Sequence, residues 1–404
     1  MTRQSTVLII TQVYVPDPPA GGQYLHDLSR ELVSKGKRVV VMTPSRGYDN
    51  PSQRYSWREI RDGVNVWRLP MCSFGKKPIF LRLLGGGSLI LQSMFLGLFV
   101  RGLTHVLIST APPMSGLAAQ FIGIFRRIRI VYWVMDLNPD QMIVTGRLNE
   151  RSVFARFSEW VNRVNLQRAN SVVALDLFMA ERLKHKVELN CKLTVIPPWP
   201  YDNQLVDIKH DKNHFRTTHG LEGRFVVMYS GNITDIHPLD TLMAAILRLK
   251  DDEHFLFLFV GAESGRRSIE AFAADNKLKN VMTMPYVPLE ETQYSLSAAD
   301  LHVVTMGNNM IGIVHPCKVY GIMSVGRPFL AIGPKESYLG EILNTAPIGW
   351  LVEHGDVEGV VKDLEQARLM SRDEWMRMGE RGRALVKMKY SRKVLCGRFS
   401  ELLE

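Results

Sequence analysis

Short apolar segments alternate with longer stretches of helical periodicity along nearly the whole chain. Segments 7–10, 38–43 and 225–229 have the length and the β-branched and aromatic residues of buried strands. Helical patterns follow such segments, for example from about residue 23 to residue 34. This alternation predicts an α/β architecture, because neighbouring parallel strands need a crossover that a helix usually supplies.

The length of 404 residues favours two domains over one core. The proline-rich segment IPPWPYDN at 196–203 interrupts both periodicities, as a linker does. We therefore expect Rossmann-like domains at 1–198 and 199–385, followed by a basic helix at about 386–404.

The formal net charge of +10 comes without a zinc-finger, helix-turn-helix or RNP pattern. It favours an anionic membrane surface and a phosphate-bearing substrate over nucleic acid. The four cysteines lie far apart without metal-ligand spacing, and the first residues lack the pattern of a signal peptide. These features indicate a reduced, cytoplasmic protein without a metal site.

An uncharged stretch at 83–100 lies between Arg82 and Arg101. Three interpretations remain open: a buried helix, a helix lying in a membrane interface, and a membrane span. The interfacial interpretation places the protein peripherally on the inner face of the plasma membrane.

Two predicted strands lead into glycine-containing loops. Gly21 and Gly22 precede a predicted helix, and Ser230, Gly231 and Asn232 follow the strand FVVMYS, with His237 further on. Ligands of open α/β sheets bind beyond the carboxyl ends of strands, where glycine lets the backbone approach an anion. A tight structural turn at the glycines and a capping role for His237 are the alternatives.

Two further segments carry candidate chemistry. In HPCKVYGIMSVGRP, Pro316 marks a predicted helix start, and Lys318 with the first helical amides could hold a diphosphate. Asp136 follows the strand predicted at 130–134, where a carboxylate can orient an acceptor hydroxyl or act as a base. The alternative for Asp136 is a helix N-cap in an Asx turn.

In order, the chain contains YVPDPPAGGQYL, DLNPD, YSGN with HPLDTL, FLFVG, SAADLHVV and HPCKVYGIMSVGRPFLAIGPKES. This series resembles the retaining GT-B glycosyltransferases of family four, especially the amino-sugar transferases of O-antigen and capsule assembly. The resemblance implies two Rossmann-like domains facing across a cleft, with the final helix crossing back to the first domain. It further implies an acceptor site in the first domain, a nucleotide-sugar site in the second, and no metal or other cofactor.

The resemblance also assigns roles. Gly21 and Gly22 would line the cleft, and Asp136 would lie beside Met135, which occupies the place of a histidine in many relatives. The expected catalytic residues are Asp136, Lys318 and His237. Gly231, Asn232 and Lys318 would touch the diphosphate, and Ser230, Pro316 and Cys317 would belong to the same donor site. Tyr286 and Val287 would lie beside the base.

The chain departs from the family pattern at four positions. Ile313 and Gly321 replace two glutamates, and Asn232 and His237 replace an arginine and a lysine. The expected activity is a metal-independent hexosyl or N-acetylhexosaminyl transfer with retention, from a UDP-linked sugar to a polyprenyl-diphosphate-linked or other membrane acceptor. The alternatives are a catalytically degenerate GT-B protein that binds a partner, and a nucleotide-sugar 2-epimerase.

Overall fold

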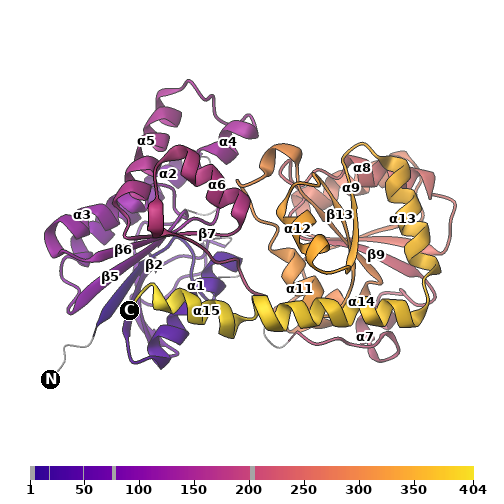
Figure 1. Ribbon diagram of the computed structural model, residues 1–404, viewed down its shortest axis with the longest axis horizontal. Coiled ribbons are helices and arrows are strands. Elements are labelled where there is room, and N and C mark those ends of the chain that lie inside the picture. Colours follow the sequence, from indigo (N-terminus) through magenta and orange to yellow (C-terminus); the bar gives the residue numbers. More distant parts are fainter. Residues whose placement is uncertain (1–4, 18, 49, 75–78, 201–204) are drawn as a thin grey trace. The chain divides into compact units, whose positions relative to one another are not determined.

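The computed structural model describes residues 5–17, 19–48, 50–74, 79–200 and 205–404, so positions 201–203 of the expected linker lie outside the described residues. The chain forms two compact units, shown in Figure 1. Unit 1 comprises Met1–Pro198, Gly312–His315 and Arg392–Glu404, and unit 2 comprises Trp199–Ile311 and Pro316–Ser391. The chain therefore returns to unit 1 twice after the first unit is complete.

Unit 1 is built on a sheet whose eight described strands have the order β3-β4-β2-β1-β5-β6-β7-β8. All neighbours are parallel except β3 and β4. The strands are β1 (Thr6–Ile10), β2 (Arg38–Pro44), β3 (Arg58–Arg61), β4 (Val64–Leu69), β5 (Leu103–Ser109), β6 (Arg129–Trp133), β7 (Ser171–Ala174) and β8 (Leu193–Val195).

Helices cover both faces of this sheet. In Figure 1, α1 and α15 lie on one face, and α2, α3 and α5 lie on the other. The helices of unit 1 are α1 (Ala20–Ser34), α2 (Ile79–Gly97), α3 (Gly116–Arg126), α4 (Asp140–Val144), α5 (Val153–Arg168), α6 (Leu177–Lys186) and α15 (Arg392–Glu401). The C-terminal α15 is integrated into unit 1: the Phe399 and Trp133 rings are 4.7 Å apart, and Arg392 pairs with Asp27 at 2.8 Å.

Unit 2 has a parallel sheet with the order β11-β10-β9-β12-β13-β14. Its strands are β9 (Phe225–Ser230), β10 (Phe255–Val260), β11 (Val281–Met284), β12 (Leu301–Thr305), β13 (Phe329–Ile332) and β14 (Gly349–Val352). Its helices are α7 (His214–Thr218), α8 (Asp240–Arg248), α9 (Glu263–Asp275), α10 (Thr292–Ala298), α11 (Lys318–Ser324), α12 (Tyr338–Thr345), α13 (Val357–Leu369) and α14 (Arg372–Leu385), which leads into a π-helical turn, Val386–Tyr390.

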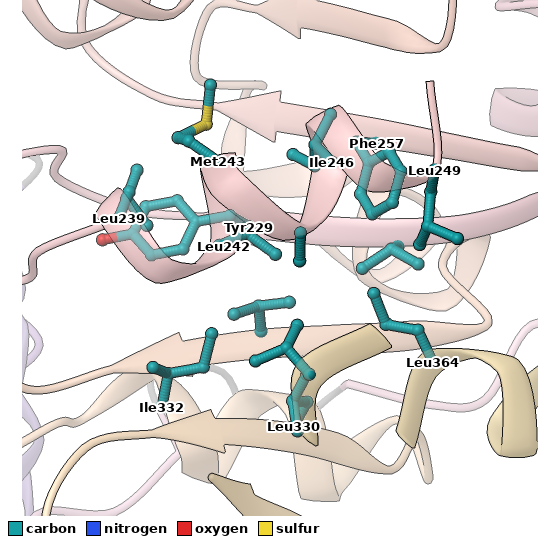
Figure 2. Close-up of a cluster of buried hydrophobic side chains, with 14 of the residues drawn as sticks. Tyr229, Leu239, Leu242, Met243, Ile246, Leu249, Phe257, Leu330, Ile332 and Leu364 are labelled. Atoms are coloured by element: carbon teal, nitrogen blue, oxygen red, sulfur yellow. The ribbon is translucent and has the colours of Figure 1, made fainter. Parts of the chain in front are cut away.

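The core of unit 2 explains why its strands read as unbroken apolar runs. Alternate side chains of β10 enter two different clusters: Phe257 packs with residues of α8 and α13, whereas Leu256 and Leu258 pack on the other face of the sheet. Figure 2 shows the first cluster, with Leu330 and Leu364 facing the residues of α8. A sheet buried on both faces needs apolar residues at every position.

The predicted α/β architecture is confirmed, with corrections at several element ends. Helix α1 begins at Ala20 rather than near residue 23, and α11 begins at Lys318 rather than at Pro316. The uncharged stretch at 83–100 lies largely in α2. Among the described residues, no helix is both long and apolar enough to cross a membrane.

Candidate functional site

The sheet of unit 2 has its topological switch point between β9 and β12. Helix α8 leads from β9 toward β10, whereas β12 continues toward β13 on the opposite side. The connections from the carboxyl ends of these two strands therefore run to opposite sides, and open α/β sheets bind their ligands at such switch points. The predicted residues Gly231, Asn232 and His237 all lie in the loop that follows β9.

Gly231 occupies a position that only glycine fits. Its φ of 145° lies in a region that side chains disfavour, and a Cβ there would lie 2.8 Å from Nζ of Lys318. Its N–H donates to the Val260 carbonyl at 2.9 Å, which fixes the start of the loop. The structure therefore brings Gly231 and Lys318 together, although 86 residues of sequence separate them.

Lys318, the first residue of α11, places its ammonium group over the ring of Tyr229, with Nζ 3.8 Å from the ring centroid. Nζ is shielded from solvent and has no hydrogen-bond partner among the described residues. Burial lowers the pKa of Lys318 to about 7. A shielded cation without an anionic partner is costly, so this group is well placed to receive an anion.

His237 connects the two strands of the switch point. Its Nδ1–H donates to the Thr305 carbonyl at the end of β12 over 2.8 Å, which leaves Nε2 as an acceptor in the neutral ring. Burial and the nearby charge of Lys318 lower the pKa of His237 to about 4. The imidazole is therefore neutral at pH 7 and can accept a hydrogen bond from a ligand hydroxyl.

Asn232 is held by two tyrosines. Tyr229 donates its hydroxyl proton to the Asn232 carbonyl at 2.7 Å, and Tyr286 donates to Oδ1 at 2.8 Å. Ser230 ends β9 beside them. Tyr286 is half exposed, whereas Val287 packs against the cluster of apolar side chains under β9 and β10. The structure thus links Tyr286, but not Val287, to the loop that carries Gly231.

The other predicted residues of the HPCK segment lie beside Lys318. Pro316 is buried, and Cys317 occupies the N-cap position of α11 without a capping hydrogen bond from its side chain. The two positions of the missing glutamates lie in apolar surroundings. Ile313 is fully buried, and a Cβ on Gly321 would contact Leu296.

In unit 1, the predicted residues also follow the carboxyl ends of strands. The backbone N–H of Asp136 donates to Thr110 Oγ1 at 3.1 Å, while its side chain is exposed. Helix α4 begins at Asp140 after Pro139, so the interpretation of Asp136 as its N-cap is wrong. The exposed carboxylate remains available to a ligand.

Gly21 and Gly22 lie in the first turn of α1. A Cβ on Gly22 would approach the backbone of Tyr14 to 3.1 Å, and one on Gly21 would lie 3.7 Å from Sδ of Met135. Close packing of α1 on the loop after β1 therefore explains Gly22, whereas Gly21 has more space around it.

Sequence reasoning missed three residues that shape these sites. Tyr229 is the last residue but one of β9, and Thr305 is the last residue of the neighbouring β12. His315 forms a buried pair with Asp176 in unit 1. An aromatic residue two positions before Gly231 was a usable signal for Tyr229, but pairing Thr305 with His237 requires the strand order. Among the described residues, no group of three or more His, Cys, Asp or Glu side chains could hold a metal ion.

Comparisons with known proteins agree with this geometry. A family model described as a glycosyl transferase 4-like domain matches residues 20–199. Residues 20–199 therefore carry a glycosyl transferase 4-like domain, in a chain that has the GT-B fold. The matched residues belong to unit 1, apart from Trp199 at the start of unit 2.

Relatives extend this family likeness over most of the chain. The Escherichia coli K12 protein WcaI, by name a colanic acid biosynthesis glycosyl transferase, is 25% identical over 383 residues, which are 90% of this chain and 92% of WcaI. The structure of sucrose-phosphate synthase from Thermosynechococcus elongatus has a TM-score of 0.79 at 17% identity, and the match covers 99% of this chain and 98% of the synthase chain. Anabaena HepE in complex with UDP and glucose has a TM-score of 0.74 at 13% identity, and the match covers 99% of both chains.

Proposed function

We propose that the protein transfers a hexose or N-acetylhexosamine from a UDP-linked sugar to a lipid-linked acceptor, with retention of configuration. The observation that carries this proposal is the shielded Lys318 cation, which faces Gly231 at the switch point of unit 2 and lacks an anionic partner among the described residues. A diphosphate supplies the missing negative charge. The similarity to HepE, whose structure contains UDP, favours uridine as the nucleoside.

In the proposed reaction, the bond between the anomeric carbon and the β-phosphate oxygen breaks, and a new bond forms to the acceptor hydroxyl oxygen. Negative charge develops on the leaving β-phosphate, where the Lys318 ammonium stabilises it. The leaving phosphate takes the proton of the acceptor hydroxyl, and Asp136 orients that hydroxyl. Gly231 and Asn232 hold the diphosphate, His237 accepts a hydrogen bond from the sugar, and Tyr286 lies beside the base.

Thermal shift against UDP-, GDP-, dTDP- and ADP-sugars tests the donor assignment. A ligand at about 100 times its dissociation constant adds about 2.7 kcal/mol to stability. We expect a shift with UDP-sugars, because the proposed site is specific for their nucleoside diphosphate. A shift with none of the four nucleotide families would contradict the proposal. It would favour the alternative of a catalytically degenerate, partner-binding protein, which the replacement of two glutamates by Ile313 and Gly321 supports.

The low pKa of Lys318 makes donor binding dependent on pH. With a pKa of about 7 in the free protein, Lys318 is charged below pH 7 and loses its proton as the pH rises. A diphosphate binds the charged form, so UDP should bind about 15-fold more weakly at pH 8.5 than at pH 7.0. Calorimetric titration at the two pH values measures this ratio, and the same ratio in Lys318→Met would show that another group causes it.

The acceptor and the location are proposed from the surface of unit 1. Helices α2 and α3, with the turn that follows α2, expose five large apolar side chains, each between 63% and 67% accessible: Leu91, Phe95, Phe99, Ile124, Phe125. We refer to these five residues as the α2–α3 face. Basic residues accompany it, with Arg82 near the start of α2 and Arg126 at the end of α3. An exposed apolar face with basic flanks suits the interface of an anionic membrane, where a polyprenyl-diphosphate-linked sugar resides.

Phe95→Asp should weaken binding to anionic vesicles about 30-fold, because an aromatic side chain leaves the interface and a negative charge enters it. Vesicle flotation at low salt measures the change. Ile60→Asp is the matched control, since Ile60 is 76% exposed on β3, outside the α2–α3 face. Equal losses in the two variants, or no vesicle binding by the parent protein, would contradict the membrane placement.

A further inference from the structure

A basic cavity of about 560 Å³ lies at the amino-terminal edge of the unit 1 sheet. Its wall includes Thr6 at the start of β1, Arg38 at the start of β2, and Gly102 just before β5. Parallel strands place their amino ends on one edge and their carboxyl ends on the other. This cavity is therefore separate from Asp136 and Gly21, which lie beyond the carboxyl ends of the same sheet.

Three arginines surround the cavity: Arg38, Arg101 and Arg126. We refer to it as the arginine pocket. The remaining wall is formed by Thr6, Leu98, Phe99, Val100 and Gly102, so no carboxylate of the described residues lines it. Within the described ranges, neither Arg38 nor Arg101 makes a side-chain hydrogen bond or ion pair, so both charges are free for a ligand.

Arg126 plays a different part from the other two arginines. Its guanidinium donates to the carbonyls of Leu98 and Val100, the latter at 3.0 Å, and so fixes the loop between α2 and β5. Thr6 Oγ1 donates to the Arg101 carbonyl at 2.9 Å and holds the same loop against β1. The backbone that carries Arg101 is thus anchored on two sides, which makes the pocket a built feature of the fold.

The surroundings add further positive charge. Burial, together with the charges of Lys37 and Arg129, lowers the pKa of His105 to about 4. Lys37 precedes Arg38, and Arg129 begins β6 at the same edge of the sheet. The potential at this edge is therefore positive beyond the three arginines of the pocket.

The arginine pocket is continuous with the α2–α3 face. Phe99 belongs to both, and its ring lies 5.2 Å from that of Phe95. Ile124 and Phe125 directly precede Arg126 in the chain and are exposed. A ligand held in the pocket by its anionic end would therefore have apolar protein surface beside it.

We propose that the arginine pocket binds the phosphate headgroup of an anionic phospholipid while the α2–α3 face enters the apolar part of the same membrane leaflet. This inference rests on the membrane placement proposed above and adds a specific lipid site to it. Guanidinium groups match phosphate oxygens in bidentate geometry, and removal from bulk water strengthens the attraction. The adjoining phenylalanines fit the acyl chains, which a soluble phosphate lacks.

The test compares two double variants that remove the same charge. Arg38→Gln with Arg101→Gln alters the pocket, whereas Arg372→Gln with Arg377→Gln removes two exposed arginines from α14 in unit 2. Binding is measured by flotation with vesicles of phosphatidylglycerol and phosphatidylcholine, and with phosphatidylcholine alone. We expect the pocket variant to bind the anionic vesicles about 30-fold more weakly, as two lost charges at an anionic surface imply, and the control to change less than about threefold.

Two results would overturn the proposal. Equal losses in the two double variants would show that net charge alone drives binding. The second result is competition by inorganic phosphate at low millimolar concentration and constant ionic strength. If phosphate abolished the difference in vesicle binding between the pocket variant and the parent protein, the pocket would be a site for free anions. The thermal shift with UDP-sugars, measured on the same variants, reports the donor site in unit 2, so failure of the lipid site and failure of the proposed activity are distinguishable.

Discussion

Replacing Lys318 with methionine is expected to lower the rate of sugar transfer by about 10²–10³-fold, the usual cost of removing one charge-stabilising contact. Methionine keeps much of the length and the apolar stem of lysine but removes the cation that lies over Tyr229. The β-phosphate then develops its charge without the cation beside Gly231. The measurement is release of UDP from the donor in the presence of acceptor, at pH 7 and saturating donor.

The stability of the ligand-free Lys318→Met variant separates this effect from unfolding. The folded protein disfavours the charged form of Lys318, as its lowered pKa indicates, so the variant should melt at the same temperature as the parent or higher. Lys335→Met is the control, because Lys335 is exposed and pairs only with Glu353 in the described structure, at 3.2 Å. A Lys318→Met variant within threefold of the parent rate would remove Lys318 from the mechanism.

Replacing Asp176 with alanine is expected to lower the free energy of unfolding by about 3 kcal/mol, the sum of a lost helix cap and a lost buried charged hydrogen bond. One carboxylate oxygen of Asp176 accepts the Met179 N–H at 2.7 Å and caps α6. The other accepts from Nδ1 of His315 at 2.7 Å. The side chain of Asp176 is 2% exposed and that of His315 is 0% exposed, so water does not replace either hydrogen bond when Asp176 is removed.

The contact between Asp176 and His315 also fixes the chain three residues before Lys318. His315 ends the segment Gly312–His315, which belongs to unit 1 and directly precedes Pro316, Cys317 and Lys318. Urea denaturation followed by circular dichroism measures the loss. Ser152→Ala, which removes only the N-cap of α5, should cost about 1 kcal/mol. A loss in Asp176→Ala no larger than that of Ser152→Ala would show that the pair with His315 contributes nothing.

Strands that are buried on both faces were predictable from sequence. The run FLFLFV in β10 has no polar residue, and its two sets of alternate side chains fill two different clusters. Strand β3, REIR, escaped prediction because its edge position leaves it largely exposed and charged, and β14 escaped because it is short and only half buried. Periodicity reports burial, so elements with little burial leave a weak signal.

The candidate site was predictable where local chain geometry defines it. Gly231 and Asn232 follow a strand, and Lys318 begins a helix, so each could be identified from its own surroundings. The packing of Lys318 against Tyr229, and of His237 against Thr305, depends on β9 and β12 being neighbours. That order arises from the crossover connections of the whole sheet, which local patterns do not contain.

Transfer from a UDP-sugar to a lipid acceptor tests the central claim most directly. The purified protein would be incubated with UDP-hexoses and UDP-N-acetylhexosamines carrying a labelled sugar, together with polyprenyl-diphosphate-linked monosaccharide in vesicles. The account predicts label in the lipid fraction, UDP released in equal amount, and a product whose anomeric configuration by NMR matches that of the donor. A product of inverted configuration would contradict retention, and no transfer from any UDP-sugar, with no thermal shift by these donors, would contradict the proposed activity itself.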